Sequence, residues 1–166
     1  MKMRTIRSML LLSIALLIIV PMILPASACA VKSTIVTGQA TASNVQFTYL
    51  KSTGNPIVAR ITSTLTFTGD FQGTGPATAI AIIDTLTGKL TFIEQVTFTG
   101  TIGNSQPGTV NILIIGNGII EGASQARDIL NHGTGGLKGL IGEGNQATAA
   151  GSDTTTFTVK ITFDRR

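Results

Sequence analysis

The chain has 166 residues, which is enough for one ordinary domain but not for two. Only 12% of the residues are charged, and the abundance of Gly, Thr, Ile and Val favours strands and turns over helices. The net charge of +4 is no sign of nucleic-acid binding, because taking Lys2, Arg4 and Arg7 from the 12 basic residues leaves nine against eight acidic ones and no basic stripe.

The first 28 residues have the layout of a secretory signal peptide. A basic start, MKMRTIRS, precedes the apolar run MLLLSIALLIIVPMIL, and Ala26-Ser27-Ala28 fits the small-residue cleavage pattern. An uncleaved membrane anchor is the alternative, because the apolar run with its flanks approaches the ~20 residues that span a membrane. In both cases the basic start stays on the cytoplasmic side and the rest is exported, to the extracellular space or the cell envelope. We expect a leader or anchor at 1–28, a tail at 29–37 and a single β-barrel domain at 38–166.

Cys29 is the only cysteine, so the fold has no internal disulfide. It follows Ala26-Ser27-Ala28, which is similar to a lipoprotein box with Ala26 in place of the usual leucine. Lipidation of Cys29 is one hypothesis, and removal with the leader or retention in the tail is the alternative. Membrane contact is expected only through the N-terminal segment or such a lipid.

Alternation of apolar and polar residues predicts strands after residue 31. In TTTFTVKITFD (Thr154–Asp164), Phe157, Val159 and Ile161 share one face, and Thr or Lys occupies the other. The same period appears in Thr41–Leu50, Ile57–Thr68 and Lys89–Thr99. More continuous apolar runs, typical of strands covered on both faces, occur at Thr78–Asp84 and Thr109–Ile115.

Turns rich in glycine and proline separate these strands at intervals of roughly 10–18 residues, which is typical of a meander or barrel. Asp128–Leu130 adds a weaker strand, and 121–131 is the only helical candidate. A closed sheet leaves no exposed edge, which matters for a chain with few charges. We therefore predict an all-β fold, a closed antiparallel barrel of about eight strands, with a two-sheet β-sandwich as the alternative.

The glycine-rich stretch HGTGGLKGLIGEG (residues 132–144) lacks the residues that a phosphate-binding loop requires. A P-loop has Ser or Thr after its lysine, whereas Gly139 follows Lys138. A dinucleotide fingerprint starting at Gly133 would need glycine where Lys138 stands. We interpret the stretch as tight bending before the final strand, in which glycine permits positive φ values, and we expect no cofactor.

Four short motifs, in order over roughly residues 38–163, carry a family resemblance. They are TGDFQG (68–73), EQVTFTG (94–100), GTV (108–110) and GTGGLKGLIGEG (133–144). They resemble a family of small barrel proteins of unknown function with the architecture of allene oxide cyclase, and the last is similar to a Gly-Thr-Gly element of dirigent proteins. The resemblance implies a calycin-like barrel with an apolar interior. It transfers no catalytic residues, because Ile112–Ile115 stands where members often have an aromatic residue or histidine.

Glu94 is the candidate site residue, because it is the one carboxylate on an otherwise apolar strand face that includes Phe92 and Phe98. A buried carboxylate must be paired, hydrogen-bonded or protonated. It would contact a ligand inside the barrel together with Phe92, Phe98 and Arg60, or act as a catalytic base. The structural alternative is an ion pair of Glu94 with Arg60 or Arg127.

The other chemically active side chains do not form recognisable sites. His132 is the only histidine, and a zinc site needs three or more His or Cys ligands. Asp70, Asp84 and Asp153 lie near expected turns and lack the spacing of a calcium loop. We therefore expect no metal site.

Three functions are compatible with this sequence. The first is a barrel that binds a small apolar or amphipathic ligand, with room left by Ala77, Ala79 and Ala81 on one face. The second is a structural or interaction module of the cell envelope with a filled barrel. The third is a cyclase or isomerase type of enzyme, which depends on fold analogy alone, so enzymatic activity is the less favoured expectation. The expected partners are a small hydrophobic ligand and, because such barrels often self-associate, a second copy of the chain.

Overall fold

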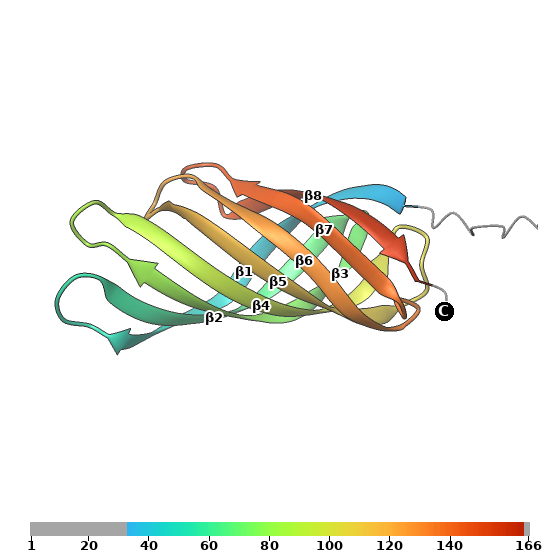
Figure 1. The fold of residues 1–166 in the computed structure, drawn as a ribbon, viewed down its shortest axis with the longest axis horizontal. Helices are drawn as coiled ribbons and strands as arrows, with labels where there is room; N and C mark the ends of the chain where they lie inside the picture. The colour runs from blue at the N-terminus through green and yellow to red at the C-terminus, as the bar shows by residue number, and fades with distance from the viewer. Residues whose placement is uncertain (1–32, 165–166) are drawn as a thin grey trace, which may run out of the picture. The chain divides into compact units, whose positions relative to one another are not determined.

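Eight antiparallel strands follow one another along the chain and close into a barrel (Figure 1). The computed structural model describes residues 33–164. The strands are β1 (Ser33–Lys51), β2 (Ile57–Gly69), β3 (Phe71–Ile83), β4 (Lys89–Ile102), β5 (Gly108–Ile119), β6 (Ser124–Gly135), β7 (Leu140–Thr148) and β8 (Thr154–Phe163). Each pairs with the next, and β1 completes the ring by pairing with β8. The predicted all-β fold, a closed antiparallel barrel of about eight strands, is confirmed.

The sequence of β8 shows how alternation divides the chain between core and solvent. Phe157, Val159 and Ile161 are buried in the barrel, whereas Thr156 and Thr158 between them are exposed. Successive side chains of a strand point to opposite faces, so an alternating sequence produces one apolar and one polar face. The inner faces of all eight strands enclose the core.

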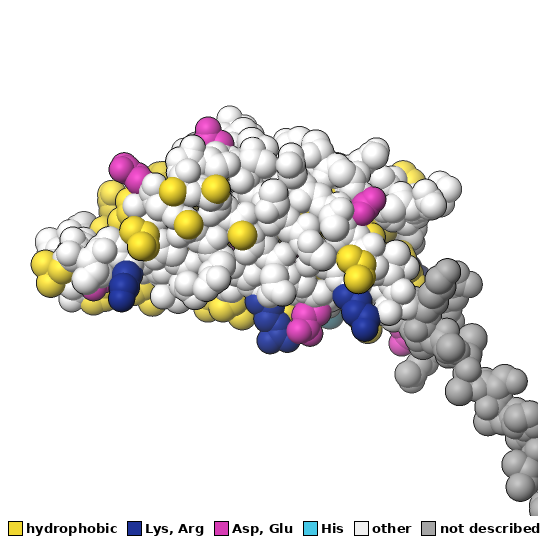
Figure 2. All heavy atoms as spheres, turned by 90° about the horizontal axis from the view of Figure 1, so that it is seen from above, with side chains coloured by type: hydrophobic (Ala, Val, Ile, Leu, Met, Phe, Trp, Pro, Cys, Tyr) yellow, Lys and Arg dark blue, Asp and Glu magenta, His cyan; other side chains and the backbone are white. Residues whose placement is uncertain are grey.

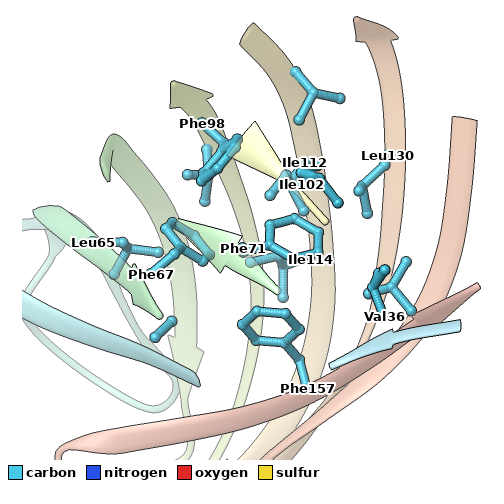
Figure 3. Packing of buried hydrophobic residues seen from close by; sticks show 14 of the residues in the cluster. Val36, Leu65, Phe67, Phe71, Phe98, Ile102, Ile112, Ile114, Leu130 and Phe157 are labelled. Atoms are coloured by element: carbon cyan, nitrogen blue, oxygen red, sulfur yellow. The ribbon is translucent and has the colours of Figure 1, made fainter. Parts of the chain in front are cut away.

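Four phenylalanine rings dominate this core (Figure 3). Phe67, Phe71, Phe98 and Phe157 come from four different strands, and the ring centroids of Phe71 and Phe157 are 4.9 Å apart in an edge-to-face contact. Aromatic pairs prefer this geometry over face-to-face stacking. The other buried residues labelled in Figure 3 are Val36, Leu65, Ile102, Ile112, Ile114 and Leu130.

The glycine-rich segment closes one end of the barrel, which we call the closed end. The turn between β6 and β7 places Leu137 in the core cluster with no exposed surface. A Cβ atom on Gly133 would collide with the carbonyl oxygen of Leu137, and one on Gly139, where φ is 76°, with that of Asp164. Glycine is required at these two approaches. The predicted tight bend is confirmed at residues 136–139, but it leads into β7, a strand that the sequence analysis does not predict, and not into the final strand.

The opposite end, which we call the open end, carries the projecting β1–β2 and β3–β4 hairpins (Figure 1). Only residues 33–41 of β1 pair with β8, so the second half of β1 continues beyond the ring. Phe47 and Tyr49 pair there with inward-facing residues of β2, yet each is 60% exposed. The amide of Asn55 links the two hairpins by donating a 2.8 Å hydrogen bond to the carboxylate of Asp84.

The outer face of the barrel carries an unbroken row of threonines across seven strands. Thr109 and Thr134 in this row share a hydrogen bond of 2.6 Å between their hydroxyl groups. Cross-strand threonine pairs of this kind stabilise a sheet by a few tenths of a kcal/mol each, about 0.2–1 kcal/mol. The row consists of Thr154, Thr41, Thr66, Thr74, Thr99, Thr109 and Thr134.

Two boundaries in the sequence prediction are wrong. The expected tail at 29–37 ends too late, because the chain is already in β1 from Ser33 and pairs there with β8. The helical candidate at 121–131 is a turn followed by β6, because pairing with β5 and β7 outweighs its weak local preference. The predicted leader at 1–28 and Cys29 lie outside the described residues.

The expectation that two strands are covered on both faces is also wrong. Ile80 and Ile82 of β3 and Ile115 of β5 point outward and are exposed, because no second layer of chain covers the barrel within residues 33–164. The continuous apolar runs therefore produce an apolar strip on the outer surface. Residues 33–164 contain no helix that is long and apolar enough to cross a membrane.

Candidate functional site

Glu94 lies on the inner face of β4. Its backbone partners are Ala79 on β3 and Ile114 on β5, and both are buried. Paired residues of antiparallel strands point to the same face, so all three side chains face the interior. Burial raises the pKa of the Glu94 carboxyl above its ordinary value. The structure thus places Glu94 on the apolar face that the sequence indicates.

Asp128 on β6 is a second inward-facing carboxyl group, and sequence analysis did not identify it. It pairs with Ile114 from the other side, so Glu94 and Asp128 flank the same residue in one row across the barrel. Their Cα atoms are two strand spacings apart, roughly 10 Å. Asp128 is 3% exposed and is the one charged side chain classed as buried in the described part of the chain. We call Glu94 and Asp128 the carboxyl pair.

The electrostatics of the carboxyl pair favour a bound proton. Burial, and then the neighbouring charge of Glu94, raise the pKa of Asp128 to about 7. Loss of hydration disfavours the charged form of an acid, and a second carboxylate nearby adds repulsion. The net charge of the pair therefore changes close to neutral pH.

A cavity of about 10 Å³ lies beside Asp128 and is also lined by Phe67, Gln146 and Phe157. The Oδ1 atom of Asp128 is buried and has no hydrogen-bond partner. The residue opposite Asp128 on β7 is Gly144, and a Cβ atom there would lie 2.7 Å from Cγ2 of Val159, which also lines the cavity. A cavity of this size holds one water-sized group.

Phe92 lies between the carboxyl pair and the open end. It is two residues from Glu94 on the same face of β4, and a Cβ atom on Gly116 of β5 would lie 2.5 Å from its Cζ atom. The same Cβ would lie 2.6 Å from that of Ala126 on β6, so the Phe92 ring reaches across β5. Phe98, also a predicted ligand contact, is instead fully buried in the aromatic core.

Arg60 and Arg127 lie on the outer face of the barrel. Arg60 is exposed next to the buried Ala59, and the Nη2 atom of Arg127 is 2.6 Å from Oε1 of Glu143 on the outer surface. The predicted ion pair with Glu94 is therefore wrong, and Arg60 does not face the barrel interior. The reason is that the two arginines occupy the outward-facing positions of their strands.

The other residues considered in the sequence analysis, among them His132, Asp84 and Asp70, do not form a metal site in the described part of the chain. Within residues 33–164 no three His, Cys, Asp or Glu side chains come together to hold a metal ion. His132 is exposed in β6 with a φ of 56°. Hydrogen bonds, chiefly from the Thr87 hydroxyl, lower the pKa of Asp84 at the β3–β4 turn to about 2. Asp70 accepts a 2.8 Å hydrogen bond from the amide of Thr37.

These features define a small all-β barrel with an apolar core and one inward-facing carboxyl pair. The chain belongs to the family described as proteins of unknown function, DUF3224, whose profile matches residues 36–159. This supports the expected family of unknown function, but not the resemblance to allene oxide cyclase.

The fold is shared with a solved member of the same family. A protein of unknown function from the DUF3224 family of Shewanella oneidensis MR-1, known from a crystal structure, superposes with a TM-score of 0.66 and is 17% identical. The match covers 80% of this chain and 99% of that one. No curated protein matches the sequence. The comparisons therefore show family and fold, and a function has to be inferred from the site.

Proposed function

We propose that the protein is an exported barrel that binds one small amphipathic ligand, with the carboxyl pair at the polar end of the ligand. The observation that carries this proposal is the buried, unpartnered Oδ1 atom of Asp128 beside a cavity. A buried polar atom without a partner destabilises a fold by about 1–3 kcal/mol. Such a group is retained where a ligand uses it, and perturbed acids cluster at functional sites for this reason.

The open end offers the apolar surface for the rest of the ligand. Backbone pairing joins Phe47, Ile61, Ala79 and Glu94 in one inward-facing row, so the exposed Phe47 lies three strands from the carboxyl pair, roughly 14 Å away. Hydrophobic side chains also gather over the open-end half of the surface, on the left in Figure 2. A molecule with an apolar body and a polar end matches this arrangement.

A filled barrel that serves as a structural module of the cell envelope is the second candidate. Ala77, Ala79 and Ala81 face inward as expected, but all three are buried, and the cavity beside the core measures only about 10 Å³. A ligand larger than one water molecule must therefore displace the Phe92 ring or open the barrel. This packing favours the second candidate, and the carboxyl pair favours the first.

Native mass spectrometry and thermal unfolding of the full-length chain distinguish the two candidates. The probes are linear alcohols, fatty acids, alkylamines and sterols. We expect at least one class to add one molecule per chain and to raise Tm, because a ligand that binds only the folded state stabilises it. A chain to which no class binds, and whose Tm stays constant, is the filled structural barrel.

A further inference from the structure

The carboxyl pair has no positive partner inside the barrel. The residues that face Asp128 across the cavity are uncharged, and they come from five strands: Phe67, Phe71, Ile114, Gln146 and Val159. Glu94 is therefore the one titratable group that faces Asp128 from the described elements packed around it. The interior carries negative charge without compensation as soon as both carboxyls ionise.

The geometry at Asp128 sets the size of the complementary group. The Oδ1 atom lacks a hydrogen-bond donor, and the cavity beside it holds one water-sized group. An ammonium group is a compact charge with three donors, whereas a guanidinium group is a wide planar fork. A hard divalent cation completes its six or more oxygen ligands with several water molecules, and a cavity of about 10 Å³ has no room for them. The site thus matches one small cationic donor.

We propose that the barrel binds a primary alkylammonium ligand, whose nitrogen contacts the unpartnered Oδ1 atom of Asp128, with the charge of Glu94 two strands away, and whose apolar chain points past Phe92 toward the open end. This inference rests on the proposed ligand-binding function and specifies the ligand class. No covalent bond forms. The ammonium group donates a hydrogen bond to the carboxylate of Asp128, the negative charge of Glu94 adds attraction, and the proton that Asp128 held passes to solvent.

Binding then depends on pH through the carboxyl pair. Burial and the charge of Glu94 hold the pKa of Asp128 at about 7, so the proton must leave Asp128 before two carboxylates face the ligand. Affinity for an alkylammonium ligand is expected to rise between about pH 6 and about pH 8, where the amine itself stays protonated. Affinity for a neutral alcohol has no such dependence.

The test is isothermal titration calorimetry of the full-length chain with hexylammonium, hexanol and hexanoate. We expect hexylammonium to bind at least about tenfold more tightly than the other two, and more tightly at the higher pH. The double variant Glu94→Gln/Asp128→Asn should lose this advantage. The control Glu143→Gln removes an outer-face carboxylate and should bind like the wild type.

Carboxyl ¹³C NMR of the wild type keeps the test independent of the variants' folding. Hexylammonium should shift the side-chain resonances of Asp128 and Glu94 and leave that of Glu143 unchanged. Equal affinity for hexanol and hexylammonium, or a Glu143→Gln variant that loses binding as the double variant does, overturns the ammonium inference but leaves a ligand-binding barrel. Failure of hexylammonium to bind also overturns it, whereas the proposed function fails only if the whole probe panel fails.

Discussion

The carboxyl group of Asp128 is titratable and is almost completely buried. Its place on the inner face of β6 follows from strand alternation, because Ala126 and Leu130 on either side are buried as well. Burial is the main cause of its raised pKa, and the charge of Glu94 adds to it. The folded state therefore binds a proton that the unfolded chain releases near pH 4, and stability falls as pH rises from there through about 7.

The substitution Asp128→Asn removes this pH dependence. The interval between 3.8 and about 7 corresponds to roughly 4 kcal/mol, so we expect the variant to exceed the wild type in unfolding free energy by roughly 2–4 kcal/mol at about pH 8. At about pH 4 both should be equally stable within about 1 kcal/mol, because Asp128 is then protonated in the folded wild type. Urea denaturation at both pH values measures the difference. A gain at about pH 8 no larger than that at about pH 4 contradicts the assignment.

The substitution Glu94→Gln separates the two causes of the Asp128 shift. Removing the neighbouring charge should lower the pKa of Asp128 below about 7, while burial keeps it above the ordinary 3.8. A ¹³C NMR titration of the Asp128 carboxyl measures this value. A pKa that stays the same would mean that the two carboxyls do not interact, and Glu143→Gln on the outer face is the matched control.

At the scale of elements, the two projecting hairpins hold each other through side chains at their turns. Asn55 of the β1–β2 turn donates to Asp84 and accepts a 2.8 Å hydrogen bond from the amide of Thr85 in the β3–β4 turn. Asp84 also accepts from the amide of Leu86 and the hydroxyl of Thr87. These bonds order both turns in a region where β8 no longer contributes.

Replacing Asn55 with alanine should loosen both hairpin tips. The amide of Thr85 loses its acceptor, so its hydrogen exchange is expected to accelerate, and the unfolding free energy should fall by about 1 kcal/mol. The control Ser52→Ala changes an exposed residue in the same turn. Exchange at Thr85 that is equally fast in both variants, or unchanged in Asn55→Ala, contradicts the role of this link.

The sequence alone predicts those strands in which one face is apolar and the other is polar. Ile57–Thr68 and Thr154–Asp164 alternate cleanly, and β2 and β8 end within one residue of these limits. In β6 the outward-facing Ile129 lies beside the inward-facing Asp128. Both faces therefore mix apolar and polar residues, and the alternation that would predict a strand is weak. The sequence thus predicts position 128 only as the first residue of the weak strand Asp128–Leu130, although its parity with Ala126 and Leu130 is a usable signal.

Of the carboxyl pair, only Glu94 could be predicted from the sequence, again because the two faces of its strand differ. Glu94 stands out because its own strand face is apolar, a local property of the sequence. Its partner comes from a strand two positions further along the barrel, and that pairing depends on register, which periodicity does not specify. The expectation of an arginine partner failed because strand parity puts Arg60 and Arg127 on the opposite face from Glu94.

At the scale of the molecule, the dryness of the interior depends on both ends of the barrel. Leu137 occupies the closed end with no exposed surface, and the Phe92 ring covers the side of the carboxyl pair that faces the open end. Neither residue pairs with Asp128, whose partners are Ile114 and Gly144. The raised pKa of Asp128 is therefore a property of the whole barrel rather than of β6.

The substitution Phe92→Ala tests this dependence. Removing the ring opens a path from the open end to Glu94 and Asp128, so water should hydrate both carboxylates and the pKa of Asp128 should fall from about 7 toward 3.8. The same ¹³C titration measures it, with Leu86→Ala as control, since Leu86 lies at the same end and is 84% exposed. The control should leave the pKa of Asp128 unchanged. If Phe92→Ala leaves it unchanged too while the chain stays folded, the ring does not shield the carboxyl pair, and a ligand entering past Phe92 loses its structural basis.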